Sequence, residues 1–171
     1  MASARSSFSR SARASVRDDL LTRFSDFARA SAPSAAFAVG ITAAIGFSKP
    51  AAAATLVQWH GLMQNNDLRS LPELLHPQAV FRSPMAHKPY AGAPMVSLIL
   101  NTVSKVFVDF AYRRELVSSD GLNVVLEFSA KVGERELKGI DMIRFDEAGK
   151  IVDFEVMIRP MSGLQALGEE M

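Results

Sequence analysis

The spacing of apolar residues predicts three helices in the first half of the domain. Residues 50–64 carry apolar positions at i, i+3, i+4 and i+7, which form one face of a helix; these are Leu56, Trp59, His60 and Met63. Residues 67–75 predict a second, short helix closed by His76-Pro77, because the residue before a proline leaves the helical region. Residues 79–83 predict a short strand, residues 85–92 a loop, and Pro94 the first turn of a third helix.

After Val108 the apolar period changes to two, which is typical of strands. Four strands are predicted, at residues 110–118, 124–131, 136–145 and 150–158, and a short tail or helix follows. The turn at Ser119-Asp120-Gly121 is a strong hairpin signal. Helices followed by a run of antiparallel strands indicate an α+β fold, in which helices cover one face of a curved sheet. Such a cone has an apolar interior that suits a small ligand.

Apolar residues also occupy the other face of the predicted sheet. Ile140 and Met142 alternate with the inward residues of their strand, and Met157 does so in the last strand. A sheet that is wet on one side alternates more cleanly. We therefore expect the outer face to be covered, most simply by a second copy in a homodimer.

Composition narrows the classes of function. The chain has 171 residues, no cysteine and a net charge of +1. The absence of cysteine excludes disulfides, thiol catalysis and Cys-ligated zinc. The charge balance argues against a nucleic-acid binder, which would carry a clear basic excess. The three histidines, His60, His76 and His87, lack the spacing of a metal site, so we expect no metal and no cofactor.

The first 49 residues differ from the rest of the chain. Residues 1–17 hold four arginines, six serines and no acidic residue, a composition typical of organellar transit peptides. Residues 35–47 are uncharged but too short for a transmembrane helix, which takes about 20 apolar residues. A targeting segment, a disordered tail and an early start codon all remain open. The protein would be organellar or exported in the first case and otherwise cytoplasmic, and any membrane contact would be made through this extension. We place the domain at residues 50–171.

The run Gly139-Ile140-Asp141-Met142-Ile143-Arg144-Phe145-Asp146-Glu147-Ala148-Gly149-Lys150-Ile151-Val152 resembles a segment of ketosteroid isomerases and of SnoaL-type cyclases. Both belong to the nuclear transport factor 2-like superfamily, and the order of elements over about residues 51–165 is similar too. The resemblance implies a cystatin-like, cone-shaped antiparallel sheet wrapped around three N-terminal helices. It marks the fold and not the reaction, because this fold hosts enzymes and non-catalytic binders.

The resemblance also implies roles for three residues. Asp141 falls where ketosteroid isomerases keep a protonated carboxylic acid and where SnoaL-type cyclases keep an acid/base Asp; an apolar cavity would raise its pKa. Trp59 falls where the isomerases place an oxyanion-hole Tyr, and an indole N–H can donate a hydrogen bond but cannot exchange a proton. Ser83 falls where they place the Asp general base, and serine has no basic form near neutral pH.

Further candidates follow from position along the chain. His87 and Tyr90 lie in the loop that could form the rim of a pocket, and Phe128 and Ile143 could form its wall. Asp141 could instead be structural, paired with Arg82 or Arg144. Glu127 could meet Arg113 or Arg114 across a hairpin.

The preferred hypothesis is a SnoaL-like protein that binds a small apolar molecule in its cone, with its specific activity undetermined. One alternative is an isomerase, cyclase or hydrolase that uses Asp141 as an acid. The other is a non-catalytic dimeric interaction protein. A second titratable group within about 6 Å of Asp141 would favour an enzyme, because acid–base work needs hydrogen-bond reach.

Overall fold

A computed structural model describes residues 48–171, so the predictions for the N-terminal extension lie outside the described residues apart from its last two positions. Within this range the chain forms four helices, α3 (Pro50–Gln64), α4 (Leu71–Leu74), α5 (Ala93–Val106) and α6 (Met161–Glu170). It also forms six strands, β1 (Leu75–Arg82), β2 (Tyr90–Ala91), β3 (Val108–Val117), β4 (Asn123–Val132), β5 (Arg135–Phe145) and β6 (Ile151–Arg159). Among residues 48–171, no helix has the combination of length and hydropathy that a membrane span requires.

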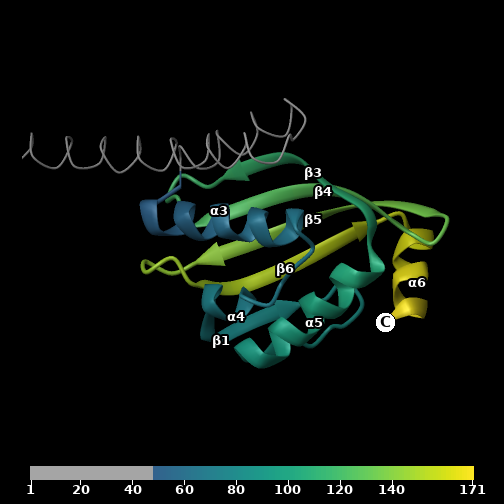
Figure 1. Cartoon of the computed structure of the whole chain (residues 1–171), viewed down its shortest axis with the longest axis horizontal. Helices are drawn as coiled ribbons and strands as arrows, with labels where there is room; N and C mark the ends of the chain where they lie inside the picture. The colour runs from purple at the N-terminus through teal and green to yellow at the C-terminus, as the bar shows by residue number, and fades with distance from the viewer. Residues whose placement is uncertain (1–47) are drawn as a thin grey trace, which may run out of the picture.

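The strands form one sheet in the order β2-β1-β6-β5-β4-β3. Strands β3 to β6 are the predicted antiparallel meander. The sheet is mixed, however, because β1 runs parallel to β6. The α+β class with helices on one face of a curved sheet is confirmed, and the fully antiparallel description is corrected at this one pair (Figure 1).

Two local predictions were wrong near the second helix. Helix α4 has only four residues, and β1 begins at Leu75 and runs through His76-Pro77. His76 is therefore a strand residue and not the end of a helix. Proline is accommodated because the pairing of β1 with β6 is irregular between Leu75 and Val80.

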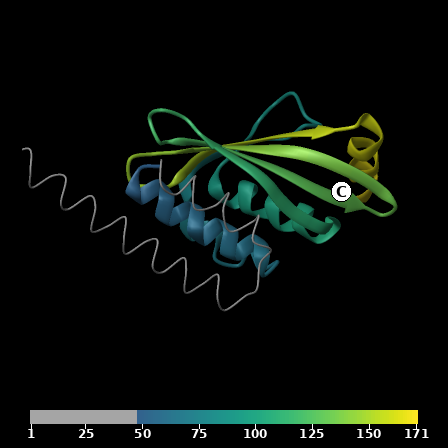
Figure 2. The ribbon, with the colours of Figure 1, turned by 90° about the horizontal axis from the view of Figure 1, so that it is seen from above.

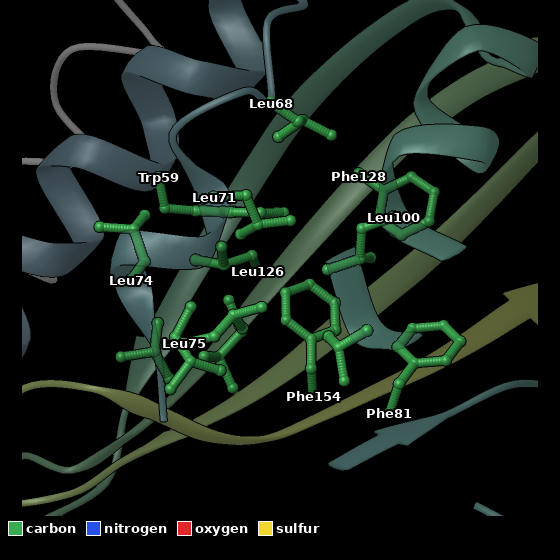
Figure 3. Close-up of a cluster of buried hydrophobic side chains, with 14 of the residues drawn as sticks. Trp59, Leu68, Leu71, Leu74, Leu75, Phe81, Leu100, Leu126, Phe128 and Phe154 are labelled. Carbon is green, nitrogen blue, oxygen red and sulfur yellow. The ribbon is translucent and has the colours of Figure 1, made fainter. Parts of the chain in front are cut away.

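Helices α3 and α5 pack on the same face of the sheet, and α6 lies at one end of it (Figure 2). Pro50 stands in the first turn of α3, where its missing N–H costs no helical hydrogen bond. The predicted stripe of α3 is buried at Leu56, Trp59 and His60. In Figure 3 the side chains of Trp59, Leu71, Leu126 and Phe154 gather between the helices and the strands.

Alternation along β4 and β5 separates the two faces of the sheet. Buried residues such as Leu126, Phe128 and Ile143 point toward the helices, and their neighbours in sequence point outward. The face toward the helices is called the concave face below, and the opposite face the outer face.

Candidate functional site

A cavity of about 310 Å³ lies between the concave face, α5 and α6. Its lining is predominantly apolar and rich in aromatic rings. The lining residues that carry a side-chain polar group are few, namely Trp59, Ser83, Tyr90, Ser104 and Asp141. A mainly apolar cavity with few polar groups is the usual form of a site for a small molecule.

Asp141 is the charged residue of this lining. It lies in the middle of β5, between Leu126 of β4 and Val156 of β6, and is 5% exposed. Its strand position turns it toward the helices, since Ile140 and Met142 on either side point outward. The structure therefore puts a carboxyl group among apolar side chains, as the sequence predicts.

A chain of hydrogen bonds ends on this carboxyl group. The indole N–H of Trp59 donates to the hydroxyl oxygen of Tyr112 at 2.9 Å, and the Tyr112 hydroxyl donates to Oδ2 of Asp141 at 2.8 Å. An indole N–H can only donate, so the Tyr112 oxygen accepts from it and its own proton is directed to Asp141. Oδ2 is thereby an acceptor, and a proton on the carboxyl group is left to Oδ1.

Burial raises the pKa of Asp141 to about 7, and the hydrogen bond from Tyr112 opposes that rise. An ionised carboxylate loses hydration in an apolar cavity, which disfavours the charged form. Burial, followed by the charge of Asp141, raises the pKa of Tyr112 well above its usual range. Near neutral pH this pair can thus hold a protonated acid beside a protonated phenol.

A β-bulge in β3 gives Tyr112 its inward direction. Tyr112 pairs with Phe128 and Arg114 pairs with Glu127, so Arg113 is an extra residue on β3. Arg113 and Arg114 both reach outer-face partners, Ser129 and Glu127 respectively. Strict alternation would put Tyr112 and Glu115 on opposite faces, and the bulge lets both face the helices.

The structure brings four of the predicted site residues to the cavity: Trp59, Ser83, Tyr90 and Asp141. Trp59 contributes its ring to the wall, but its N–H is used by Tyr112. The Ser83 hydroxyl accepts the backbone N–H of Met85 at 3.1 Å and so shapes the turn at the cavity mouth. Tyr90 is 39% exposed and lies at that mouth.

The other three predicted residues lie outside the lining. His87 is exposed in the loop before β2. Phe128 packs behind Phe107 and Phe110 and over Gly139, where a Cβ atom would come within 2.3 Å of its ring. Ile143 is buried two residues further along β5 than Asp141, and it does not line the cavity.

Sequence reasoning missed Tyr112, the partner of Asp141. Its signal was available, because Phe110 and Tyr112 are two positions apart in a predicted strand and share its inward face. The alternative pairing of Asp141 with Arg82 or Arg144 was wrong, since both arginines lie near Asp153. The expected ion pair between Glu127 and Arg114 is confirmed.

Among residues 48–171, no group of three His, Asp or Glu side chains could hold a metal ion. The titratable group in hydrogen-bond contact with Asp141 is the phenol of Tyr112. With its raised pKa, Tyr112 is a hydrogen-bond donor and not a base near neutral pH.

Comparison with solved structures finds close relatives. A steroid delta-isomerase from Pseudomonas aeruginosa is 76% identical, with 72% of this chain and 90% of that chain covered and a TM-score of 0.72. An uncharacterised protein with a cystatin-like fold from Silicibacter pomeroyi is 34% identical, covering 68% and 81% of the two chains, with a TM-score of 0.64. The epoxide hydrolase/cyclase-like enzyme SalBIII, 14% identical over 64% of this chain and 91% of that one, shares the fold, with a TM-score of 0.54. No family model and no curated protein matches the chain.

Proposed function

The chain belongs to the nuclear transport factor 2-like superfamily, with the ketosteroid isomerase-like and SnoaL-like proteins, and we propose that its cone binds one small apolar molecule through a hydrogen bond from Asp141. The carrying observation is the Trp59–Tyr112–Asp141 chain, which ends on a buried carboxyl group in an apolar cavity. Because Tyr112 donates to Oδ2, the proton of the Asp141 carboxyl group lies on Oδ1 and can be donated to a carbonyl or hydroxyl oxygen of a ligand.

The lining supports this ligand chemistry. Aromatic rings from Phe81, Phe107, Phe110 and Phe154 offer flat apolar contacts, and a single buried acid offers one strong polar contact. An anionic ligand would find no Lys, Arg or His among the described lining residues. A neutral, mainly hydrocarbon molecule with one buried acceptor fits best.

Paired probes test the proposal on the purified full chain. Fluorenone and fluorene share a tricyclic skeleton and differ by one carbonyl oxygen. Trp59 is the only tryptophan of the chain, so quenching of its fluorescence reports binding at the cavity. We expect fluorenone to bind about 5- to 10-fold more tightly at pH 6, the equivalent of one hydrogen bond.

Two variants sharpen this test. D141N retains a donor of the same shape and should keep the preference for fluorenone, whereas D141A should lose it. Wild-type affinity should weaken above pH 7, as Asp141 ionises, and D141N affinity should not. Equal binding of the two probes by the wild type would contradict the proposal.

An alternative is catalysis with Asp141 as an acid, in the manner of an isomerase, cyclase or hydrolase. It is favoured by the 76% identity to a protein described as a steroid delta-isomerase and by a pKa of about 7, which suits proton transfer at neutral pH. Shifting a double bond also needs a base, and Ser83 cannot supply one. Asp141 itself is the one carboxylate of the described lining that could.

A 3-oxo-Δ5-steroid separates the two functions. Conversion to the conjugated ketone is followed by ultraviolet absorption. Turnover by the wild type that D141N lacks, at unchanged affinity for fluorenone, would establish the enzyme. Binding by both proteins without turnover by either supports a binding protein for this class of molecule.

We also propose that the protein forms a homodimer through the outer face of its sheet. Leu116, Val125, Met142, Ile140 and Met157 lie side by side on β3 to β6 through their backbone pairing. Leu116 is 63% and Met157 49% exposed. Ion pairs flank this apolar patch on two sides, Arg114–Glu127 and Arg82–Asp153, which is the arrangement of an interface core with a polar rim.

A further inference from the structure

A second buried pair of titratable side chains lies beside the cavity. Nε2 of His60 is 3.1 Å from Oε1 of Glu115, and their side chains are 1% and 3% exposed. Neither residue lines the cavity, and the proposed ligand contact does not use them. Moving a carboxylate out of water costs free energy unless the carboxylate is paired. A buried pair of this kind is therefore a candidate for a function in the site.

The two residues come from the same two elements as the hydrogen-bond chain. Helix α3 supplies both Trp59 and His60, and strand β3 supplies both Tyr112 and Glu115. The contact between His60 and Glu115 therefore fixes the spacing of α3 and β3 close to the Trp59–Tyr112 hydrogen bond, one residue along α3 and three residues along β3. A change of a few tenths of an ångström in that spacing would weaken the bond.

The pair also acts directly on Tyr112. The ring of His60 meets the ring of Tyr112 edge to face, at 5.2 Å and 88°, and Phe110 does the same from another side, at 4.9 Å and 87°. Burial and the charge of Asp141 are the main causes of the raised pKa of Tyr112, and the charge of Glu115 adds a smaller contribution in the same direction. Tyr112 is thus held in place by two rings and one indole N–H, and one of those rings, His60, is itself paired with Glu115.

We propose that His60 and Glu115 are positioning residues of the site, which hold Tyr112 so that its hydroxyl is donated to Asp141. The groups that face this assembly are Trp59 and His60 from α3, Tyr112 and Glu115 from β3, and Asp141 from β5. Loss of the pair frees the Tyr112 ring, and Asp141 then loses the hydrogen bond that stabilises its ionised form.

The test follows the ionisation of Asp141 in the full chain without any ligand. Trp59 fluorescence is recorded from pH 5 to 9, and D141N identifies the transition that belongs to Asp141 by abolishing it. E115A and H60F should each raise the midpoint by about one pH unit, and E115Q, which retains an oxygen acceptor for His60, should raise it less. E115A should add nothing in the Y112F background, because the two changes remove the same hydrogen bond.

The control is E127A, which breaks the Arg114–Glu127 ion pair on the outer face of the same hairpin and should leave the midpoint unchanged. The single indole N–H resonance of ¹⁵N-labelled protein gives a second measurement, and it should move in H60F and E115A. If one of the two variants does not fold, the other carries the test, because H60F keeps a ring against Tyr112 and E115A leaves no unpaired carboxylate. An unchanged midpoint and resonance in folded H60F, or an E115A shift that persists without the Tyr112 hydroxyl, would overturn the proposal. The inference rests on the proposed site, but these measurements need no ligand, so they can succeed or fail independently of fluorenone binding.

Discussion

The hydroxyl of Tyr112 lies 2.8 Å from Oδ2 of Asp141, although strand β4 separates their strands. The phenol side chain crosses β4 on the concave face, where it remains between the sheet and α3. This contact links the outermost strand of the meander to the centre of the cavity. The protonation state of the carboxyl group therefore depends on a residue two strands away from it.

Removal of the Tyr112 hydroxyl should raise the pKa of Asp141 above its value of about 7. The hydroxyl stabilises the ionised carboxylate, and a hydrogen bond to a charged group contributes about 1.5–3 kcal/mol, or roughly one to two pH units. Y112F should show this rise in a pH titration followed by Trp59 fluorescence. The other tyrosine provides the control, because Y90F alters only the exposed cavity mouth and should leave the midpoint in place.

Sequence patterning was sufficient for the order of the meander strands β3 to β6 and for the inward direction of Asp141. Alternation along β5 alone turns Asp141 inward between Ile140 and Met142, and the stripe of α3 places Trp59 and His60 against the sheet. These features depend on local periodicity, which a sequence displays directly.

The partners of Asp141 depend on features that periodicity does not display. The bulge at Arg113 shifts the register of β3, and without it Tyr112 and Glu115 could not share the concave face. The cavity excludes Phe128 because Gly139 lets that ring lie against the strand. Strand β1 also pairs in parallel with β6, about 75 residues later in the chain. This long-range pairing is not indicated by local periodicity.

Replacement of Asp141 by Asn should stabilise the protein at alkaline pH and have little effect at acidic pH. The folded-state pKa is raised from 3.8 to about 7, so the folded state binds the proton more tightly than the unfolded state between these values. Stability is accordingly lost as pH rises through this window, by up to about 4 kcal/mol above pH 7. Urea unfolding of D141N and wild type at pH 5, 6, 7 and 8 should show a difference that grows with pH.

Asp67 gives a control of opposite sign. A hydrogen bond and the charge of Arg69 lower its pKa to about 2, so its contribution is present above the unfolded value of 3.8 and is lost as pH falls through 2. D67N should therefore not gain stability at high pH. A constant difference between D141N and wild type from pH 5 to 8 would show that Asp141 titrates normally.

The turn between β5 and β6 should not tolerate a side chain at Gly149. This glycine has φ of +82°, and a Cβ atom would lie 2.5 Å from the carbonyl oxygen of Ala51 in α3. G149A should combine backbone strain with displacement of the helix and cost about 2–4 kcal/mol in urea unfolding. Gly133 has φ of +52° with open space around it, so G133A isolates the backbone effect and should cost about 1 kcal/mol. Equal losses would mean that the contact with α3 does not matter.

A charge placed on the outer-face patch should separate the proposed dimer. Met142 belongs to the patch; its cross-strand neighbours are Val125 and Glu155, and Ile140 is the preceding residue on the same face of β5. Burying a single unpaired carboxylate at an interface core costs several kcal/mol, so M142E should weaken association by a factor of at least about 100. Sedimentation velocity over a range of concentrations should find a dimer for the wild type and a monomer for M142E.

A matched variant excludes a general effect of added charge. Leu98 is 63% exposed on α5, away from the sheet, and L98E should remain a dimer. Circular dichroism should show the same fold for both variants, because Met142 points away from the core. A monomeric wild type at high micromolar concentration would contradict the dimer, and a dimer that survives M142E would move the interface to another face.

If M142E is monomeric and still prefers fluorenone to fluorene, the concave site does not need the second copy. Loss of that preference in the monomer would instead couple the cavity to the outer face through β5, which carries Asp141 inward and Met142 outward.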